Sequence, residues 1–117
     1  MSSAAGTLEA VDRILNRGGD ADDVLRAVVD ALVDRGGCVW AGILFSEDGE
    51  LVLGPEAGTP HPAARAQVPV DYQGTRVAEL VADGCDDRAL LDRVALLISA
   101  YCLVGWDTGG VPWDPAT

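Results

Sequence analysis

The side chains able to perform acid–base, nucleophilic or metal chemistry are few, and one histidine and three cysteines stand out among them. His61 lies between two prolines, and no serine, cysteine or acid lies beside it in the sequence to form a catalytic pair. It is therefore interpreted as an exposed loop histidine. The acidic stretches at residues 20–23 and 47–50 are interpreted as a helix start and a hairpin tip, and no metal site is predicted.

The three cysteines form an odd set without a C-x-x-C pair, a pattern that favours reduced thiols in a cytoplasmic protein. Cys38 and Cys102 lie inside apolar runs and are expected to be inert members of the core. Cys85 precedes a predicted helix and lies near Arg88, a setting that stabilises a thiolate. A thiol enzyme based on Cys85 is thus one alternative, but no catalytic residue and no cofactor is predicted.

Trp40 is the aromatic residue best placed to contact a small molecule. It alternates with Gly42 on one face of a predicted strand, and a glycine leaves space that a ligand or another backbone can fill. The alternative is a core tryptophan packed against a helix. With Arg65 and Tyr72 expected near the same face, the candidate ligand-binding residues are Trp40, Gly42, Arg65 and Tyr72.

The composition excludes several classes of partner. The chain has 117 residues, with eight arginines, no lysine and 19 acidic residues, which gives a net charge of 8 − 19 = −11. Nucleic acids and anionic membranes require concentrated positive charge, so neither is expected as a partner. No signal peptide is predicted, and no apolar run is long enough to span a bilayer, which again favours a cytoplasmic location.

The elements that must position these side chains begin with two helices. Thr7 is expected to cap the first helix, in which apolar residues recur at helical spacing until Gly18. Asp20 is expected to open the second helix, whose broad apolar stripe ends at residues 35–37. The polar opposite face of this helix indicates that the helix lies on another element.

A hairpin and a loop follow. Residues 38–45 are apolar at odd and even positions alike, which is typical of a central strand covered on both faces. A turn at residues 46–49 leads into an antiparallel strand over residues 50–53. The segment Gly54–Ala66 holds three prolines and no periodicity, and it is predicted to be a loop.

The second hairpin is predicted to pair residues 67–71 with residues 75–83 around a turn at 72–74. Pro69 lacks an amide donor, which places its strand at a sheet edge or the proline at a position without a ladder bond. A last helix is expected from Asp86 to about Val104.

The second half of the last helix is apolar on nearly every side, around Leu96, Ala100 and Leu103. Such a helix is expected to be covered on more than one side. Residues 1–104 are predicted to form one domain, and residues 105–117 are predicted to be a Gly/Pro-rich tail. The tail tryptophans, Trp106 and Trp113, are expected to fold back over this helix or to dock on a partner.

The order helix, helix, hairpin, hairpin, helix predicts an α+β domain with an antiparallel sheet. Within that order, one set of stretches stands out as a pattern: Trp40–Leu44, Leu51–Pro55 with Gly58, Val68–Val70, Gly74, Arg76-Val77, Leu80, Asp87, Leu90-Leu91, Val94-Ala95 and Ile98. In this order they resemble the GAF domain family, and in particular its free methionine-(R)-sulfoxide reductase branch. The resemblance extends from about Leu8 to Leu103 and implies a GAF-like sheet of two hairpins flanked by helices.

The departures from the family pattern bear on function. GAF domains usually carry a longer segment between the two hairpins, which forms the lid of the ligand pocket, and the reductase branch carries its catalytic cysteines there. Here only Gly54–Ala66 lies between the hairpins, and it contains no cysteine. The resemblance therefore implies a reduced GAF-like domain with a shallow or open pocket and no inherited reductase activity. Roadblock-like and profilin-like domains have similar layers, but they place a helix between their hairpins.

In the GAF family, the first and last helices commonly build a dimer. The predicted interface residues are Leu8, Val11, Leu96, Ala100 and Leu103. The sequence thus predicts a non-catalytic GAF-like module in cytoplasmic signalling, acting as a homodimer or through a protein partner. The alternative is a small-molecule sensor with a residual pocket on the sheet face.

Overall fold

A computed structural model of the chain describes residues 4–47, 49–85 and 87–102. The elements in chain order are α1 (Ala4–Arg17), α2 (Ala21–Asp34), β1 (Trp40–Glu47), β2 (Glu50–Gly58), the short 3₁₀ helix η1 (Pro62–Ala64), β3 (Arg65–Tyr72), β4 (Thr75–Asp83) and α3 (Arg88–Cys102). The predicted α+β class, with two helices before two hairpins and one helix after them, is confirmed.

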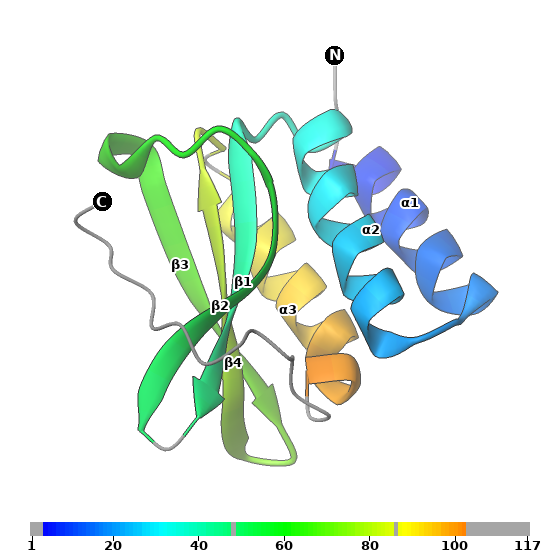
Figure 1. Cartoon of the computed structure of the whole chain (residues 1–117). Coiled ribbons are helices and arrows are strands. Elements are labelled where there is room, and N and C mark those ends of the chain that lie inside the picture. The colour runs from blue at the N-terminus through cyan, green and yellow to red at the C-terminus, as the bar shows by residue number, and fades with distance from the viewer. Residues whose placement is uncertain (1–3, 48, 86, 103–117) are drawn as a thin grey trace.

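The four strands form one antiparallel sheet in the order β2-β1-β4-β3. The two hairpins therefore adjoin directly through β1 and β4 at the centre, and β2 and β3 form the edges. The three helices lie on the same side of the sheet (Figure 1): α2 contacts β1 and β2, α3 contacts β3 and β4, and α1 contacts both helices.

The main core lies between the sheet and the helices, because side chains of period two along the strands meet helical stripes of period 3.6. Its strand members include Ile43, Phe45, Val68 and Leu80, all buried. Its helical members are Val11, Leu25, Val28, Val29, Leu32, Leu90, Leu91, Val94, Ala95, Ile98 and Cys102. A smaller cluster of Trp40, Leu44 and Val81 lies on the opposite face of the sheet.

The segment between the hairpins differs from the prediction. The structure continues β2 to Gly58 and begins β3 at Arg65, so the predicted loop Gly54–Ala66 is reduced to a short connection around η1. Pro55 is tolerated because the register with β1 shifts between Gly42 and Leu44, which leaves two residues of an edge strand opposite one on β1.

The second hairpin agrees with the prediction. β3 is an edge strand, as Pro69 indicated, and Tyr72 pairs with Thr75 across the turn. Gln73 and Gly74 both have positive φ, of 51° and 84°, the geometry of a two-residue type I′ turn.

Two predicted helix boundaries were wrong. Thr7 is buried inside α1, which begins at Ala4, so it does not cap this helix. Among the described residues, α3 begins at Arg88, later than Asp86. Trp106, Trp113 and the predicted tail at residues 105–117 lie outside the described residues. No helix in the described ranges is long and apolar enough to cross a membrane.

Candidate functional site

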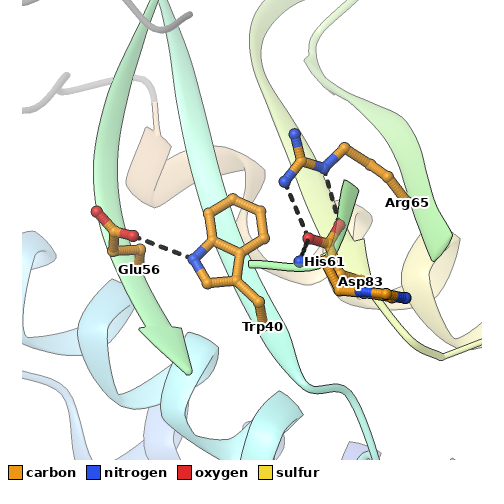
Figure 2. A network of polar contacts seen from close by, with 5 residues as sticks. All are labelled: Trp40, Glu56, His61, Arg65 and Asp83. Carbon is orange, nitrogen blue, oxygen red and sulfur yellow. Dashed lines mark hydrogen bonds and ion pairs between the residues drawn. The ribbon is translucent and has the colours of Figure 1, made fainter. Parts of the chain in front are cut away.

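The strand register gathers a polar cluster at one end of the sheet face that points away from the helices. Trp40 on β1 pairs with Asp83 on β4, and Asp83 pairs with Arg65 on β3. Paired residues of antiparallel strands point to the same side, so these three side chains form one row across the sheet. Figure 2 shows the Trp40 indole between Glu56 of β2 and the Arg65–Asp83 pair.

Asp83 is the centre of this cluster and is fully buried, with 0% of its surface exposed. Its two oxygens accept hydrogen bonds from Nε and Nη2 of Arg65 at 2.8 and 2.9 Å, and Oδ2 also accepts one from the His61 backbone N–H at 2.7 Å. The carboxylate is therefore held by a bidentate guanidinium and by the connection that leads into η1.

The pKa of Asp83 reflects opposing influences. Burial, the largest single one, acts to raise it. The hydrogen bonds from Arg65 and from the His61 N–H, together with the charge of Arg65, outweigh burial, and the pKa of Asp83 lies below its ordinary value. A carboxylate held in this way is a weak proton acceptor, which fits a structural anchor better than a general base.

Trp40 is 1% exposed and contacts charged groups on both sides. Its Nε1 donates to Oε1 of Glu56 at 3.0 Å, and the Arg65 guanidinium carbon lies 4.9 Å from the ring centroid. An arginine over an indole face gains a cation–π attraction. The same arginine thus binds the Asp83 carboxylate and covers the tryptophan.

The space that Gly42 leaves is already occupied. A Cβ added at Gly42 would lie 2.7 Å from two atoms of the Trp40 ring, so the indole lies along its own strand over this glycine. The glycine is required for the close approach of Trp40 and does not open a hollow for a ligand.

The four candidate ligand-binding residues are therefore only partly brought together. Trp40, Gly42 and Arg65 share one end of the sheet face that points away from the helices. Tyr72 lies at the other end of β3, beside the turn. It is seven positions after Arg65, which corresponds to about 23 Å along an extended strand. Tyr72 does not belong to this cluster.

Asp83 and Glu56 were missed as site residues. The sequence does contain a signal for Asp83: it is an acidic residue at the end of an apolar strand, where a buried and therefore paired carboxylate can be expected. The contacts of the cluster could not be assigned from the sequence. Arg65, the partner of Asp83, and Glu56, the partner of Trp40, both fell within a segment predicted to be a loop.

The prediction of three reduced thiols was wrong for two of them. Cys38 and Cys85 form a disulfide, with Cα atoms 4.7 Å apart, that links the start of β1 to the segment between β4 and α3. The sequence could not reveal this pair, because 47 positions separate the two residues and only the sheet order brings them together. The argument for a cytoplasmic location from reduced cysteines therefore loses its basis.

The remaining cysteine, Cys102, is buried as predicted. Burial raises the pKa of its thiol to about 12. At neutral pH this thiol is protonated, so it lacks the thiolate that nucleophilic chemistry requires.

The predicted interface residues occupy different environments. Val11 is 0% exposed and belongs to the core, so its side chain presents no surface to a partner; this prediction is corrected. Leu8 is half-buried against the same core. Leu96 and Ala100 are exposed on α3, whereas Leu103 lies outside the described residues.

The comparisons with known proteins rest on structure. No family model matches the chain, and no curated protein matches it in sequence. The GAF domains of phosphoenolpyruvate-protein phosphotransferases from Coxiella burnetii and Acinetobacter superpose with TM-scores of 0.71 and 0.70, each at 14% identity. They cover 94% and 95% of this chain and the whole of the respective GAF domains. The chain has the GAF fold.

Two free methionine-R-sulfoxide reductases share this fold at low identity. The type II enzyme from Thermoplasma acidophilum matches 74% of this chain and 94% of its own, with a TM-score of 0.62 and 16% identity. The enzyme from Neisseria meningitidis, solved in complex with its substrate, matches 87% and 93%, with a TM-score of 0.69 and 17% identity. The GAF fold thus occurs in both kinds of neighbour, and the fold alone does not assign this chain a role.

Proposed function

We propose that this chain is a non-catalytic GAF-like module that acts through protein contact, as a homodimer or with a protein partner, by way of the outer face of α3. The observation that carries the proposal is Leu96, a large apolar side chain that is 65% exposed on a helix whose inner face is fully packed. Ala100, one turn further along, is exposed on the same face and extends the apolar stripe.

The state of the thiols supports the non-catalytic part of this proposal. Cys38 and Cys85 are joined to each other, and Cys102 is buried with a strongly raised pKa. A sulfoxide reductase requires a reactive thiolate, which none of these three sulfurs provides in this state. Asp83, the buried acid of the polar cluster, is fully engaged by Arg65 and by the His61 amide.

The test is the mass of the chain in solution. Sedimentation equilibrium at tens of micromolar should give about twice the 12.1 kDa chain mass, and Leu96→Asp should return the monomer. Thr75→Asp, which adds the same charge at an exposed position on β4, is the control and should leave the mass unchanged. A monomeric native chain would overturn the homodimer, and a dimer insensitive to Leu96→Asp would overturn the role of α3.

A second candidate function is small-molecule sensing on the sheet face that points away from the helices, where the Arg65 side chain lies over the buried Trp40 and keeps 13% of its surface exposed. A ligand at a hundred times its dissociation constant should add about 2.7 kcal/mol of stability. A thermal-shift screen of metabolites and nucleotides on the native chain tests it. No shift from any compound would remove this candidate.

A further inference from the structure

An open groove of about 310 Å³ is lined by residues of α1 and α2. Both helices lie on the side of the sheet opposite to the polar cluster (Figure 1). The apolar lining of the groove consists of Ile14 and three alanines, Ala10, Ala27 and Ala31. Side chains this small let another helix approach closely, because the distance between packed helix axes depends on the residues at the contact.

The two walls of the groove carry charges of opposite sign at the same spacing. Arg13 and Arg17 lie one turn apart on α1, and Asp30 and Asp34 lie one turn apart on α2. Residues four apart on a helix lie on the same face, about 6 Å from each other. Each wall therefore carries a short row of like charges. Because only three residues join α1 to α2, the two helices are antiparallel, so the arginine row lies toward this connection and the aspartate row lies toward the opposite end of the groove.

These charges do not neutralise each other across the groove. Within the described part of the chain, the side chains of Arg17, Asp30 and Asp34 have no ion pair. Arg13 approaches only Glu9, on its own helix, at 3.9 Å. The two walls remain available to groups that enter between them.

The charge pattern defines what fits. Arg35 adds a third cation, next to Asp34 at the end of α2, so the lining holds three arginines and two aspartates in a chain whose net charge is −11. The arginines of α1 attract acids, whereas the aspartates of α2 repel a polyanion and attract bases. An occupant therefore needs acids on the edge that faces α1, near the α1–α2 connection. It needs bases on the edge that faces α2, near the opposite end, and small apolar groups between the two edges.

We propose that the α1–α2 groove binds an amphipathic helix of a partner protein, with two acids four residues apart facing Arg13 and Arg17 and two bases facing Asp30 and Asp34. A helix laid in a groove presents its residues at i and i+4 along each edge, which matches the spacing of both walls. This surface is separate from the α3 stripe, so the inference stands or falls independently of the proposed function.

The probe is a synthetic peptide of about 15 residues, because shorter isolated helices are marginal in water. It is capped at both ends, stapled on its outer face, and carries alanine on the inner face. Two glutamates four residues apart lie on one edge near one end of the peptide, and two lysines four residues apart lie on the other edge near the other end. Fluorescence anisotropy gives its affinity for the full chain, and amide shifts in ¹⁵N spectra locate the site. We expect saturable binding, with shifts confined to α1 and α2.

Charge reversal supplies the decisive comparison. Arg13→Glu with Arg17→Glu should weaken the peptide at least tenfold, and a peptide with lysines in place of its glutamates should recover the loss. Asp30→Lys with Asp34→Lys is an independent second variant, expected to lose affinity for the original peptide. Arg93→Glu, an exposed reversal on α3, is the matched control and should bind like the native chain.

Four outcomes would overturn the proposal. They are no binding at millimolar peptide, shifts that map to α3 or to the sheet, affinities unchanged by both reversals, or a native dimer that Arg13→Glu with Arg17→Glu converts to a monomer. The last outcome would assign the groove to a second copy of this chain. Circular dichroism and thermal unfolding confirm that each variant is folded before its affinity is compared.

Discussion

The two ends of the sheet are held together in different ways. At the end where β1 starts, a disulfide, a buried ion pair and long-range backbone bonds converge, including Val39 N–H to Asp83 C=O and Thr59 N–H to Val39 C=O, both at 2.8 Å. At the other end lie the two hairpin turns and one exposed ion pair, Arg76–Asp71 at 2.9 Å. One end is closed by residues distant in sequence, the other by close neighbours.

The difference between the two sets of links predicts which end of the sheet contributes more to the free energy of unfolding. The hairpin end needs only turn residues with suitable backbone conformations, such as Gln73 and Gly74. The opposite end brings together segments whose ordering costs more chain entropy, and its links are covalent or buried. Substitutions at the end where β1 starts should therefore lower the free energy of unfolding much more than equivalent substitutions at the turns.

Loss of the disulfide should have the largest effect. Replacing Cys38 and Cys85 together by alanine removes a link across 47 residues, and loop-closure entropy predicts a loss of about 4 kcal/mol in the free energy of unfolding. Urea denaturation measures it. Reducing agent should destabilise the native chain and leave the double variant unchanged, and a loss below about 1 kcal/mol would show that the link adds little.

Removal of the Asp83 charge should come next. Asp83→Asn keeps the shape of the side chain but leaves Arg65 without its anion, and we expect a loss of about 2–3 kcal/mol. Glu79→Gln, on the same strand and the same face, is the matched control. Equal losses from both variants in urea denaturation would contradict the central role of Asp83.

Acid should weaken the same end of the sheet. The folded pKa of Asp83 lies below the unfolded value of about 3.9, so its contribution is complete above that pH and is lost as the pH falls through the folded pKa. Urea denaturation between pH 7 and pH 2 should show the native chain losing stability below about pH 4 more steeply than Asp83→Asn. If the free energies of unfolding of the native chain and of Asp83→Asn fell in parallel with pH, the titration of Asp83 would not contribute to the acid sensitivity.

The hairpin end should give the smallest effect. Arg76→Ala removes an ion pair whose side chains are 53% and 50% exposed, and such pairs contribute about 0.5 kcal/mol or less. High salt should abolish even that difference. A loss comparable to that of Asp83→Asn would remove the distinction between the two ends.

The same contrast explains how much of the fold could be predicted. The order of the helices, the central strand and the turn at 72–74 depend on periodicity and local turn chemistry. These predictions are confirmed, apart from the two helix boundaries. The extension of β2 through Pro55 depends on a bulge opposite β1, which is a tertiary feature. The prolines correctly indicated an irregular backbone near Pro55, but this irregularity is a bulge within β2 and not a loop over the whole of Gly54–Ala66.

The site was less predictable than the fold for a related reason. Trp40 and Gly42 were correctly placed on one strand face, because the alternation of a strand is a local inference. Arg65 does lie beside them, although it was assigned to a loop and not to the strand that brings it there. Asp83, Glu56 and the Cys38–Cys85 pair depend on which strands lie side by side, and no local pattern contains that information. The environment of Val11 likewise follows from the way α1 packs on the two other helices.

The prolines of the two edge strands have a consequence for self-association. Pro55 lies at the bulge of β2, and Pro69 lies in β3, so each border of the sheet lacks a backbone donor where an incoming strand would need one. Growth of the sheet by strand addition, the first step toward fibrils, is thereby discouraged.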